Sequence, residues 1–270
     1  MTATRPTPAD VPVPSVLRLR SLWVLLAFCV ATAAAADEWQ TVAAGVDYRA
    51  ITRPAMEAHV VRVDLAQPGL RVIATATAER GLTVSEFARR RNAIVAINGD
   101  YFDVDLRPIG LAMGAGEVWA VADESIRRQE VIGVGGRRVE IFPRIEPLRT
   151  PEDWMTGAVS GWPTVVRDCD PVEPLPGSDF FTRAPHPRTA VGLSADRRLL
   201  YLVVVDGRRE GLPGLTLPEL ARLLDEVGAC IAVNLDGGGS SAMWVIDRIV
   251  NQPSDLAERP VANHLGIIAD

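Results

Sequence analysis

The chain has 270 residues, of which 48% are apolar, and carries a formal net charge of -6 at pH 7. A net acidic chain repels the phosphates of nucleic acid, so its charge argues against nucleic acid as a partner. The length and apolar content suffice to bury one sizeable core, and no linker or internal repeat divides residues 37–270, so we expect a single domain there.

The first 36 residues differ in composition from the rest. A Pro-rich start and two arginines, Arg18 and Arg20, precede an apolar run over residues 21–36 that ends in three alanines. This order is typical of an export signal that is cleaved before Asp37. We therefore predict a signal peptide over residues 1–36 and an exported product, periplasmic or secreted. The alternative is an uncleaved segment that anchors the protein in the membrane.

The first part of the domain reads as strands around a helix. Alternating polar and apolar residues predict strands over 57–65 and 70–76, and the wholly apolar run 93–97 predicts a buried strand. Between them, Thr83-Val84-Ser85-Glu86 forms a capping box, which predicts a helix that begins there and reaches Arg90 or Arg91.

The middle of the chain is poorer in regular patterns. Short strands with Gly turns are predicted over residues 111–141, and residues 143–152 are typical of an irregular surface passage. Residues 168–187 have the most loop-like composition, with five prolines between Pro171 and Pro187. A loop of that length is either functional or disordered.

The second half predicts a strand, a helix and another strand. Residues 199–205 and 230–235 are apolar, and the capping box Thr216–Glu219 opens a helix that Gly228 ends. This succession suggests one parallel crossover, whereas the other connections are short and favour antiparallel hairpins. The predicted fold class is α/β or α+β, a single domain with a mixed, largely antiparallel sheet and at least two packed helices.

Two cysteines, Cys169 and Cys230, remain after the predicted signal peptide is removed. In an oxidising compartment they would be able to form a disulfide that closes a loop of about 60 residues. Spacing alone does not fix their separation in space, so free thiols stay the alternative.

Asp236-Gly237-Gly238-Gly239-Ser240-Ser241 is the most informative stretch, because it directly follows an apolar strand and precedes another, residues 242–246. Three glycines let backbone N–H groups approach an anion, and the carboxylate and hydroxyls add polar groups. A flexible linker has a similar composition, but a linker between two core strands is not expected. Three further polar clusters also follow apolar runs or precede them: Asn98–Asp103, Pro187–Ala190 and Asp206–Arg208.

Together these clusters resemble the phosphodiester glycosidase family. The resemblance spans most of the domain and rests on residues 96–102, 187–192, 206–207 and 234–241, followed by residues 250–255 and 259–263. One departure concerns Asp100, because the family commonly has glycine there. The resemblance implies cleavage of a sugar, of the N-acetylglucosamine type, from a sugar 1-phosphodiester with a phosphomonoester as the leaving group.

A phosphomonoester leaves as a stable anion, so one essential carboxylate and a phosphate-binding group would suffice where most glycosidases need two carboxylates. We expect Asp236 to stabilise or attack the sugar, Asp206 to be the second candidate carboxylate, and Arg188 to hold the phosphate. The expected substrate-binding residues are Asn98, Gly99, Asp100, His186, Thr189, Asn234, Gly237, Gly238, Gly239, Ser240 and Ser241.

Other function classes fit less well. Gly238–Ala242 approaches the serine-hydrolase elbow, with Asp255 and His264 in the expected order, but residues 244–250 predict a hairpin where an elbow needs a helix. A nucleotide-binding P-loop fits still less well, because the chain contains no lysine and therefore no Gly-Lys-Ser/Thr sequence. A glycan-binding module without catalysis remains the main alternative.

No cofactor is predicted. The acidic residues Asp100, Asp103, Asp206 and Asp236 would suit calcium or magnesium, whereas no His or Cys spacing supports zinc. The expected partner is a sugar or glycan linked through a phosphodiester, and contact with a membrane is expected only if residues 21–36 are retained as an anchor.

Overall fold

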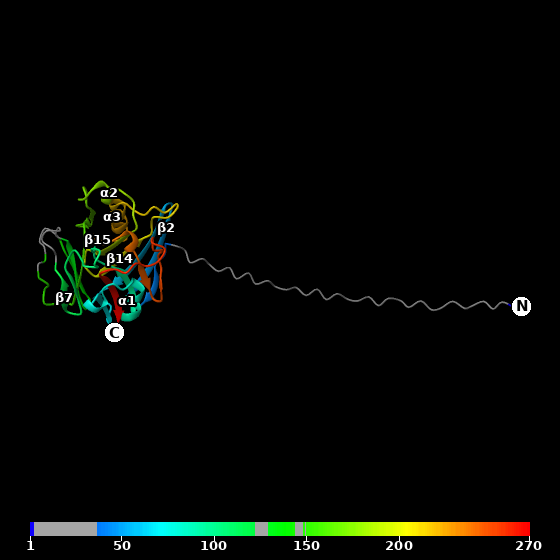
Figure 1. Ribbon diagram of the computed structural model, residues 1–270, viewed down its shortest axis with the longest axis horizontal. Coiled ribbons are helices and arrows are strands. Elements are labelled where there is room, and N and C mark those ends of the chain that lie inside the picture. The colour runs from blue at the N-terminus through cyan, green and yellow to red at the C-terminus, as the bar shows by residue number, and fades with distance from the viewer. Residues whose placement is uncertain (3–36, 122–128, 144–147, 149) are drawn as a thin grey trace. The chain divides into compact units, whose positions relative to one another are not determined.

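The computed structural model describes residues 1–2, 37–121, 129–143, 148 and 150–270. Ala34–Asp270 forms one compact unit, shown as the ribbon of Figure 1. Almost all of the predicted signal peptide, including the apolar run that would serve as an anchor, lies outside the described residues. Among the residues that are described, no helix is long and apolar enough to cross a membrane.

The largest sheet has eight strands, and it carries the strand predicted over residues 57–65 at its centre, next to the one predicted over 199–205. In spatial order the strands are β1 (Gln40–Ala43), β2 (Val46–Arg53), β3 (Met56–Asp64), β14 (Leu199–Val205), β13 (Arg188–Leu193), β15 (Ile231–Asn234), β11 (Thr164–Arg167) and β12 (Asp170–Pro171).

Two five-stranded sheets complete the unit. The second sheet has the order β17 (Arg248–Ile249), β16 (Met243–Val245), β5 (Ala93–Asn98), β18 (His264–Ala269) and β4 (Leu70–Ala74). The third has the order β7 (Glu117–Ala120), β6 (Ala112–Gly114), β10 (Gly157–Gly161), β8 (Glu130–Gly135) and β9 (Arg138–Phe142).

All the strand pairs that the structure describes are antiparallel, which confirms the predicted fold class of helices packed on largely antiparallel sheets. The predicted parallel crossover between residues 199 and 235 joins two strands that are not direct neighbours in the sheet. Strands β14 and β15 both pair with β13 in the antiparallel sense, so they run parallel to each other with β13 between them.

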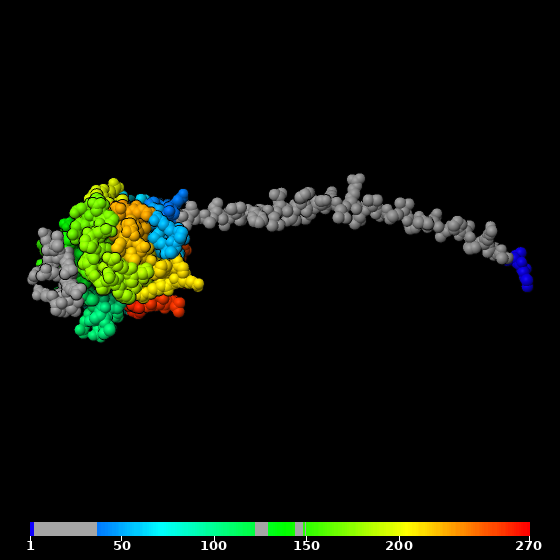
Figure 2. Space-filling view, turned by 90° about the horizontal axis from the view of Figure 1, so that it is seen from above, coloured from blue at the N-terminus to red at the C-terminus, as the bar shows by residue number. Residues whose placement is uncertain are grey.

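The helices begin where the capping boxes predict. Thr83 caps α1 (Val84–Arg91) and Thr216 caps α3 (Leu217–Glu226), and in each the cap hydroxyl accepts a hydrogen bond from the amide three residues on. Gly228, at φ +100, follows α3 and allows the chain to reverse. A third, short helix, α2 (Asp179–Thr182), lies in the Pro-rich loop and packs beside α3, as Figure 2 shows for the yellow-green and orange segments.

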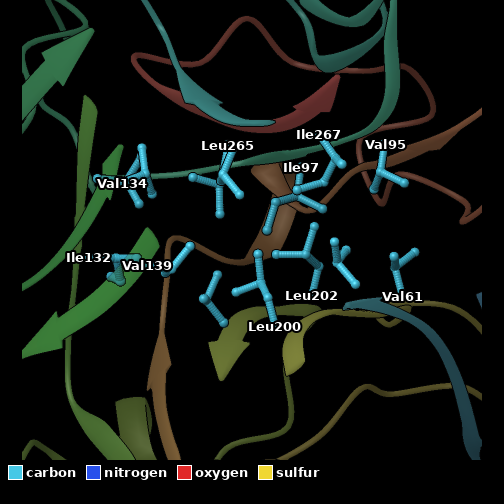
Figure 3. Close-up of a cluster of buried hydrophobic side chains, with 14 of the residues drawn as sticks. Val61, Val95, Ile97, Ile132, Val134, Val139, Leu200, Leu202, Leu265 and Ile267 are labelled. Carbon is cyan, nitrogen blue, oxygen red and sulfur yellow. The ribbon is translucent and has the colours of Figure 1, made fainter. Parts of the chain in front are cut away.

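The main core lies where the three sheets face one another. Figure 3 shows Leu200 and Leu202 of β14 pointing toward Ile97 of β5, while Ile132 and Val134 of β8 close one side. A second core separates the opposite face of the eight-stranded sheet from α3, whose Leu220, Leu223 and Leu224 are buried there, as the apolar spacing predicts. Helix α1 covers the outer face of the second sheet.

Cys169 and Cys230 form a disulfide that joins the β11–β12 turn to the start of β15. The bond closes a loop with a sequence separation of 61 residues. By the chain-entropy argument such a closure stabilises the folded state by about 4 kcal/mol, and it ties the edge of the large sheet to the strand that carries the glycine motif.

Candidate functional site

Asp236 lies just beyond the end of β15 and opposite Arg188. Ala190 of β13 pairs with Asn234 of β15, and the Leu235 amide donates to the Thr189 carbonyl at 2.8 Å, so the antiparallel register continues past the end of the strand. Two further residues along each strand place Asp236 across from Arg188. The two groups expected to act on the sugar and the phosphate are therefore brought together by strand pairing.

The backbone of Asp236 is held by the second sheet. Asn98, at the end of β5, donates from Nδ2 to the Asp236 carbonyl at 2.7 Å, and the Asp236 amide donates to the Gly99 carbonyl at 3.1 Å. Thr189 in turn donates to Oδ1 of Asn98 at 2.8 Å, and its hydroxyl lies 3.2 Å from that of Ser241. Asn98, Gly99, Thr189 and Ser241 are buried, and their hydrogen bonds hold the Asp236 backbone and the glycine motif in position.

The carboxyl group of Asp236 lies in a polar but poorly hydrated setting. Burial raises its pKa to about 6, although the Ser240 hydroxyl, the Gly237 amide and the positive charges of Arg259 and Arg208 favour the ionised form. Gly237 donates to Oδ1 at 3.0 Å. The Ser240 hydroxyl is buried and lies beside the Asp236 carboxyl group, whose ionised form it favours.

The glycine motif differs from the anion cradle expected from its sequence. The Gly237 amide is turned to its own neighbour Asp236, and the Gly238 amide donates to the Pro187 carbonyl at 2.9 Å. Those two N–H groups are therefore not free to bind phosphate, which corrects that expectation. The amide of Gly239 has no partner in the part of the chain that is described, so it alone retains the expected property.

Arg188 is 3% exposed and is bonded to carbonyl groups. Its Nε donates to the carbonyl of Leu215 at 2.9 Å, and its Nη2 donates to those of Phe181 at 2.9 Å and Ala184 at 3.2 Å. No carboxylate within the described ranges pairs with it, and Nη1 has no partner there. Burial lowers the pKa of Arg188 to about 10, which leaves it charged at neutral pH. Arg188 therefore holds the Pro-rich loop in place through these carbonyl groups, and its Nη1 can still donate a hydrogen bond to an anion.

Aromatic rings cover Arg188 on the side of α2. Trp162 stacks on Phe181 with ring centroids 5.1 Å apart, and the guanidinium carbon of Arg188 lies 5.6 Å from the centroid of the Phe181 ring. His186 packs edge-on to Phe180, and its Nε2 lies 3.3 Å from the Phe180 carbonyl. Partial burial lowers the pKa of His186, so the ring stays neutral down to a lower pH than a free histidine does. The structure places His186 in this rim.

Asn234 and Tyr101 form the base of the site. The Nδ2 of Asn234 donates to the Trp162 carbonyl at 2.9 Å and to the Tyr101 hydroxyl, which itself donates to the same carbonyl at 3.1 Å. The Oδ1 of Asn234 is buried and has no partner among the residues described, so an acceptor is left over. Burial, together with the negative charge of Asp236, raises the pKa of Tyr101, which stays protonated.

Asp206 does not share a site with Asp236. Side chains alternate along a strand, and Val204 of β14 faces the core between the sheets, as does Leu235. Asp206 therefore points to that same face and Asp236 to the opposite one. This strand geometry does not support the expectation that Asp206 is a second carboxylate at the sugar.

Asp206 is instead saturated with donors. It accepts hydrogen bonds from Asn251 at 3.2 Å, from the Gln252 amide at 2.9 Å and from Arg209 at 2.9 Å, and His59 Nε2 lies 3.6 Å away. Burial opposes ionisation, but hydrogen bonding and the charge of His59 outweigh it, and the pKa lies below its usual value. Because Asn251 also donates to the Ser241 carbonyl at 3.1 Å, Asp206 positions the glycine motif.

Asp100 is also turned away from the site. It is 1% exposed, and its two oxygens accept hydrogen bonds from the Ser160 amide and the Asn263 side chain, both at 2.6 Å. Burial raises its pKa to about 8. The expected contact with substrate is therefore corrected, because Asp100 joins β10 to the segment before β18.

One group of side chains has the composition of a cation site. Glu57, His59 and Asp206 place one ligand atom each within 4.8 Å of one another. Arg209, however, donates to Asp206 at 2.9 Å and to Glu57 at 3.2 Å, so a guanidinium already balances the carboxylates. The residues do not fit a resident metal well, and no step of the chemistry is assigned to one.

The sequence placed Arg208 in a polar cluster but gave it no role in the site. Its neighbours Asp206 and Gly207 form a good turn signal, which draws attention away from the arginine, yet Arg208 lies against the Gly238 backbone and influences Asp236. A cavity of about 570 Å³ lies elsewhere, between the β2–β3 turn and α3, where Arg53 pairs with Glu226. Its lining lacks Asp236 and Arg188, so concavity alone would have misplaced the site.

The geometry also bears on the serine-hydrolase alternative. Ser240 ends a short 3-10 turn, η2 (Gly238–Ser240), and the chain continues into the hairpin β16–β17, as predicted, where an elbow would need a helix. His264 is bonded to Thr75 and Leu82 and stacks on Phe87. It is not available to act as a base for Ser240.

Comparison with known proteins gives the family. Residues 91–268 match the phosphodiester glycosidase family. The chain belongs to that family. It is 28% identical over 191 residues to the bovine N-acetylglucosamine-1-phosphodiester alpha-N-acetylglucosaminidase, an alignment that covers 66% of this chain and 36% of the relative. A prophage-derived protein of Bacillus subtilis, itself uncharacterized, is 39% identical over 82 residues, which are 30% of this chain and 13% of that protein.

Solved structures of the family show the same fold. The zebrafish N-acetylglucosamine-1-phosphodiester alpha-N-acetylglucosaminidase catalytic domain, auto-inhibited by its pro-peptide, superposes with a TM-score of 0.66 at 21% identity, covering 88% of this chain and 85% of that one. This phosphodiester glycosidase domain spans about a third or less of the length of the curated relatives that it matches.

Proposed function

We propose that the protein is a hydrolase that releases a sugar of the N-acetylglucosamine type from a sugar 1-phosphodiester. The observation that carries the proposal is the strand register that places Asp236 across from Arg188, with the charge of Arg208 acting on Asp236 and the unpaired Oδ1 of Asn234 at the base of the site. A carboxylate beside a cation and free hydrogen-bonding groups suits a substrate that joins a sugar to a phosphate.

The reaction breaks the bond between the sugar C1 and the phosphoester oxygen. The electron pair of that bond leaves with the oxygen, which becomes part of a phosphomonoester, and water supplies a hydroxyl group to C1 while its second proton passes to solvent. Asp236 in its ionised form stabilises the positive charge that develops at C1, or attacks C1 first and is released by water. Arg188 stabilises the charge that accumulates on the leaving phosphate.

No second carboxylate is required for the leaving group. Asp206 and Asp100 are both turned away from Asp236, and the stable phosphate anion leaves without a proton from a strong acid. The aromatic rim of Trp162, Phe181 and Phe180 supplies apolar faces on which a sugar ring packs.

We also propose that the protein acts outside the cytoplasm, periplasmic or secreted, after cleavage of residues 1–36. The Cys169–Cys230 disulfide supports this placement, because disulfides persist in oxidising compartments. Retention of the apolar segment as an anchor is the alternative, and mass determination of the amino terminus of the mature protein tests it.

The test of the activity uses purified residues 37–270 and sugar 1-phosphodiesters that include UDP-N-acetylglucosamine and simple alkyl phosphodiesters. We expect release of reducing sugar, its loss by a factor of about 10⁴ or more in Asp236→Asn, and no change in the control Asp247→Asn, an exposed carboxyl in the β16–β17 turn. Circular dichroism checks that both variants fold. A folded protein that binds these compounds without cleaving any of them would establish a glycan-binding module instead.

A further inference from the structure

We infer that Arg208 is a phosphate-binding residue of this site, and that its guanidinium, held against the Gly238 backbone, makes the enzyme specific for sugars linked through a phosphodiester. The inference rests on the proposed function and names the group that recognises the charged part of the substrate. Under this inference the glycine motif makes room for the Arg208 guanidinium, whereas the sequence suggested that its backbone N–H groups bind the anion.

The position of Arg208 is fixed by its backbone. Arg208 has a φ of +57, a left-handed conformation that is unusual for arginine, and its amide donates to the Pro213 carbonyl at 3.2 Å. Gly207 before it lies so close to Pro187 and Gly214 that a Cβ there would be 2.8 Å from the Pro187 nitrogen. Close packing around the turn thus aims the arginine side chain toward the residues that follow β15.

The Arg208 guanidinium lies directly against the Cα position of Gly238. A Cβ on Gly238 would lie 2.8 Å from Nη2 of Arg208 and 3.1 Å from its Cζ, and the φ of Gly238 is +62. A side chain at position 238 would therefore be strained and would also displace the arginine. The absence of a side chain at Gly238 makes room for Arg208 above the glycine motif.

The charge of Arg208 has no partner within the protein. Arg208 is exposed, and the residues that the structure describes give it no ion pair and no side-chain hydrogen bond. Arg259, which also acts on Asp236, is already engaged by Asp255, to which its Nε donates at 3.0 Å. Arg208 is therefore the cation beside Asp236 that is free to bind an anion.

Arg208 and Arg188 both lie beside the glycine motif, because Arg208 packs against Gly238 and the Gly238 amide donates to the carbonyl of Pro187, the residue before Arg188. Two cations at one motif indicate a negatively charged ligand. Burial is the main cause of the lowered pKa of Arg188, and the positive charge of Arg208 lowers it further, so the two guanidinium groups repel each other. A phosphate between the free Nη1 of Arg188 and the guanidinium of Arg208 would relieve that repulsion. Guanidinium groups suit this task because their planar donors match phosphate oxygens.

The same arrangement explains how Arg208 contributes to rate. The phosphodiester carries one negative charge, and the leaving phosphomonoester gains another as the C1–O bond breaks. A cation at the phosphate is bound more strongly in the transition state than in the ground state, so it increases kcat. A nitrophenyl glycoside of the same sugar carries no phosphate, and the charge of its departing phenoxide lies on the glycosidic oxygen and the ring, so a cation that binds non-bridging phosphate oxygens assists it far less.

The experiment compares Arg208→Gln with Arg197→Gln. Arg197 is a matched control because it is also exposed and left-handed, at φ +60, but lies in the β13–β14 turn at the other end of these strands. We expect Arg208→Gln to lower kcat/KM for a sugar 1-phosphodiester by about 100-fold or more and to leave that for the nitrophenyl glycoside within about threefold. Arg197→Gln should leave both unchanged.

Binding provides a readout that does not depend on turnover. Titration calorimetry with UDP-N-acetylglucosamine compares Asp236→Asn with the double variant Asp236→Asn, Arg208→Gln, and we expect the second to bind about 10-fold or more weakly. Equal binding by the two proteins, or equal loss of activity toward charged and neutral substrates in Arg208→Gln, would overturn the inference. If wild type cleaves no phosphodiester, the proposed activity fails, and the calorimetric comparison still decides whether Arg208 binds phosphate.

Discussion

Replacing Arg188 with methionine should release the loop that carries α2. Methionine keeps much of the length of the side chain but provides no donor. The Leu215 carbonyl would retain its bond from the His186 amide, at 3.1 Å, whereas the carbonyls of Phe181 and Ala184 would lose the arginine donors that now reach them. The loss is therefore concentrated in the segment around α2.

The size of the effect follows from these two bonds. A hydrogen bond to a charged group contributes about 1.5–3 kcal/mol net, so losing two of them costs about 3–6 kcal/mol. Removing the buried charge also relieves its desolvation penalty, which favours the lower end of this range. A change of about 3 kcal/mol in the local opening free energy corresponds to a loss of about 100-fold in hydrogen-exchange protection.

Native-state hydrogen exchange measures this directly at the amides of Phe181, Thr182 and Arg183, which donate to carbonyls of Ser178 and Asp179. The matched control is Arg183→Met on the same segment. The Arg183 side chain is 80% exposed and pairs with Asp179 at 3.2 Å, and such a surface pair contributes about 0–1 kcal/mol. We expect the control to keep its protection.

Protection that stays within about threefold of wild type in Arg188→Met would refute the role of Arg188 in fastening the loop. An equal loss in Arg183→Met would do the same, because it would show that any change in the segment loosens it. Arg188→Lys is informative beside them, since lysine keeps the charge but lacks the fork that reaches separate carbonyls.

Two further predictions concern the carboxylates. Because the pKa of Asp236 is about 6 and its ionised form acts, kcat/KM should fall about tenfold per pH unit below that value, and a pH–rate profile flat between pH 4 and 7, roughly, would contradict the assignment. Asp206 has a depressed pKa, so its stabilisation is present above the unfolded value of 3.8 and is lost as pH falls through the folded one. Asp206→Asn should thus lower the melting temperature at pH 7 and have less effect near pH 3, as thermal unfolding at both pH values would show.

Local signals in the sequence were sufficient for many elements. The capping boxes at Thr83 and Thr216 gave the starts of α1 and α3, because a cap depends on residues within one helical turn. The apolar run over residues 199–205 likewise predicted the bounds of β14. The hairpin predicted over residues 244–250 corresponds to β16 and β17, which turn at residues 246–247.

The arrangement of the site depended on contacts that are distant in sequence. Asp206 and Asp236 follow apolar strands in the same way, and only the register of β13 between them reveals that they face opposite sides of the sheet. The bonds of Arg188 to a loop and of Asp100 to Ser160 and Asn263 likewise join segments whose proximity no local pattern encodes.

The place of β18 in the second sheet has a consequence for synthesis of the chain. Residues His264–Ala269 lie between β4 and β5, which are made more than 160 residues earlier, so β4 and the β16–β5 pair are joined into one sheet only by the last of the described strands. Asn98, which bonds the Asp236 backbone, lies at the end of β5 and pairs with His264 at the start of β18. The position of the site residue Asp236 is therefore tied to the strand of the described domain that is made last.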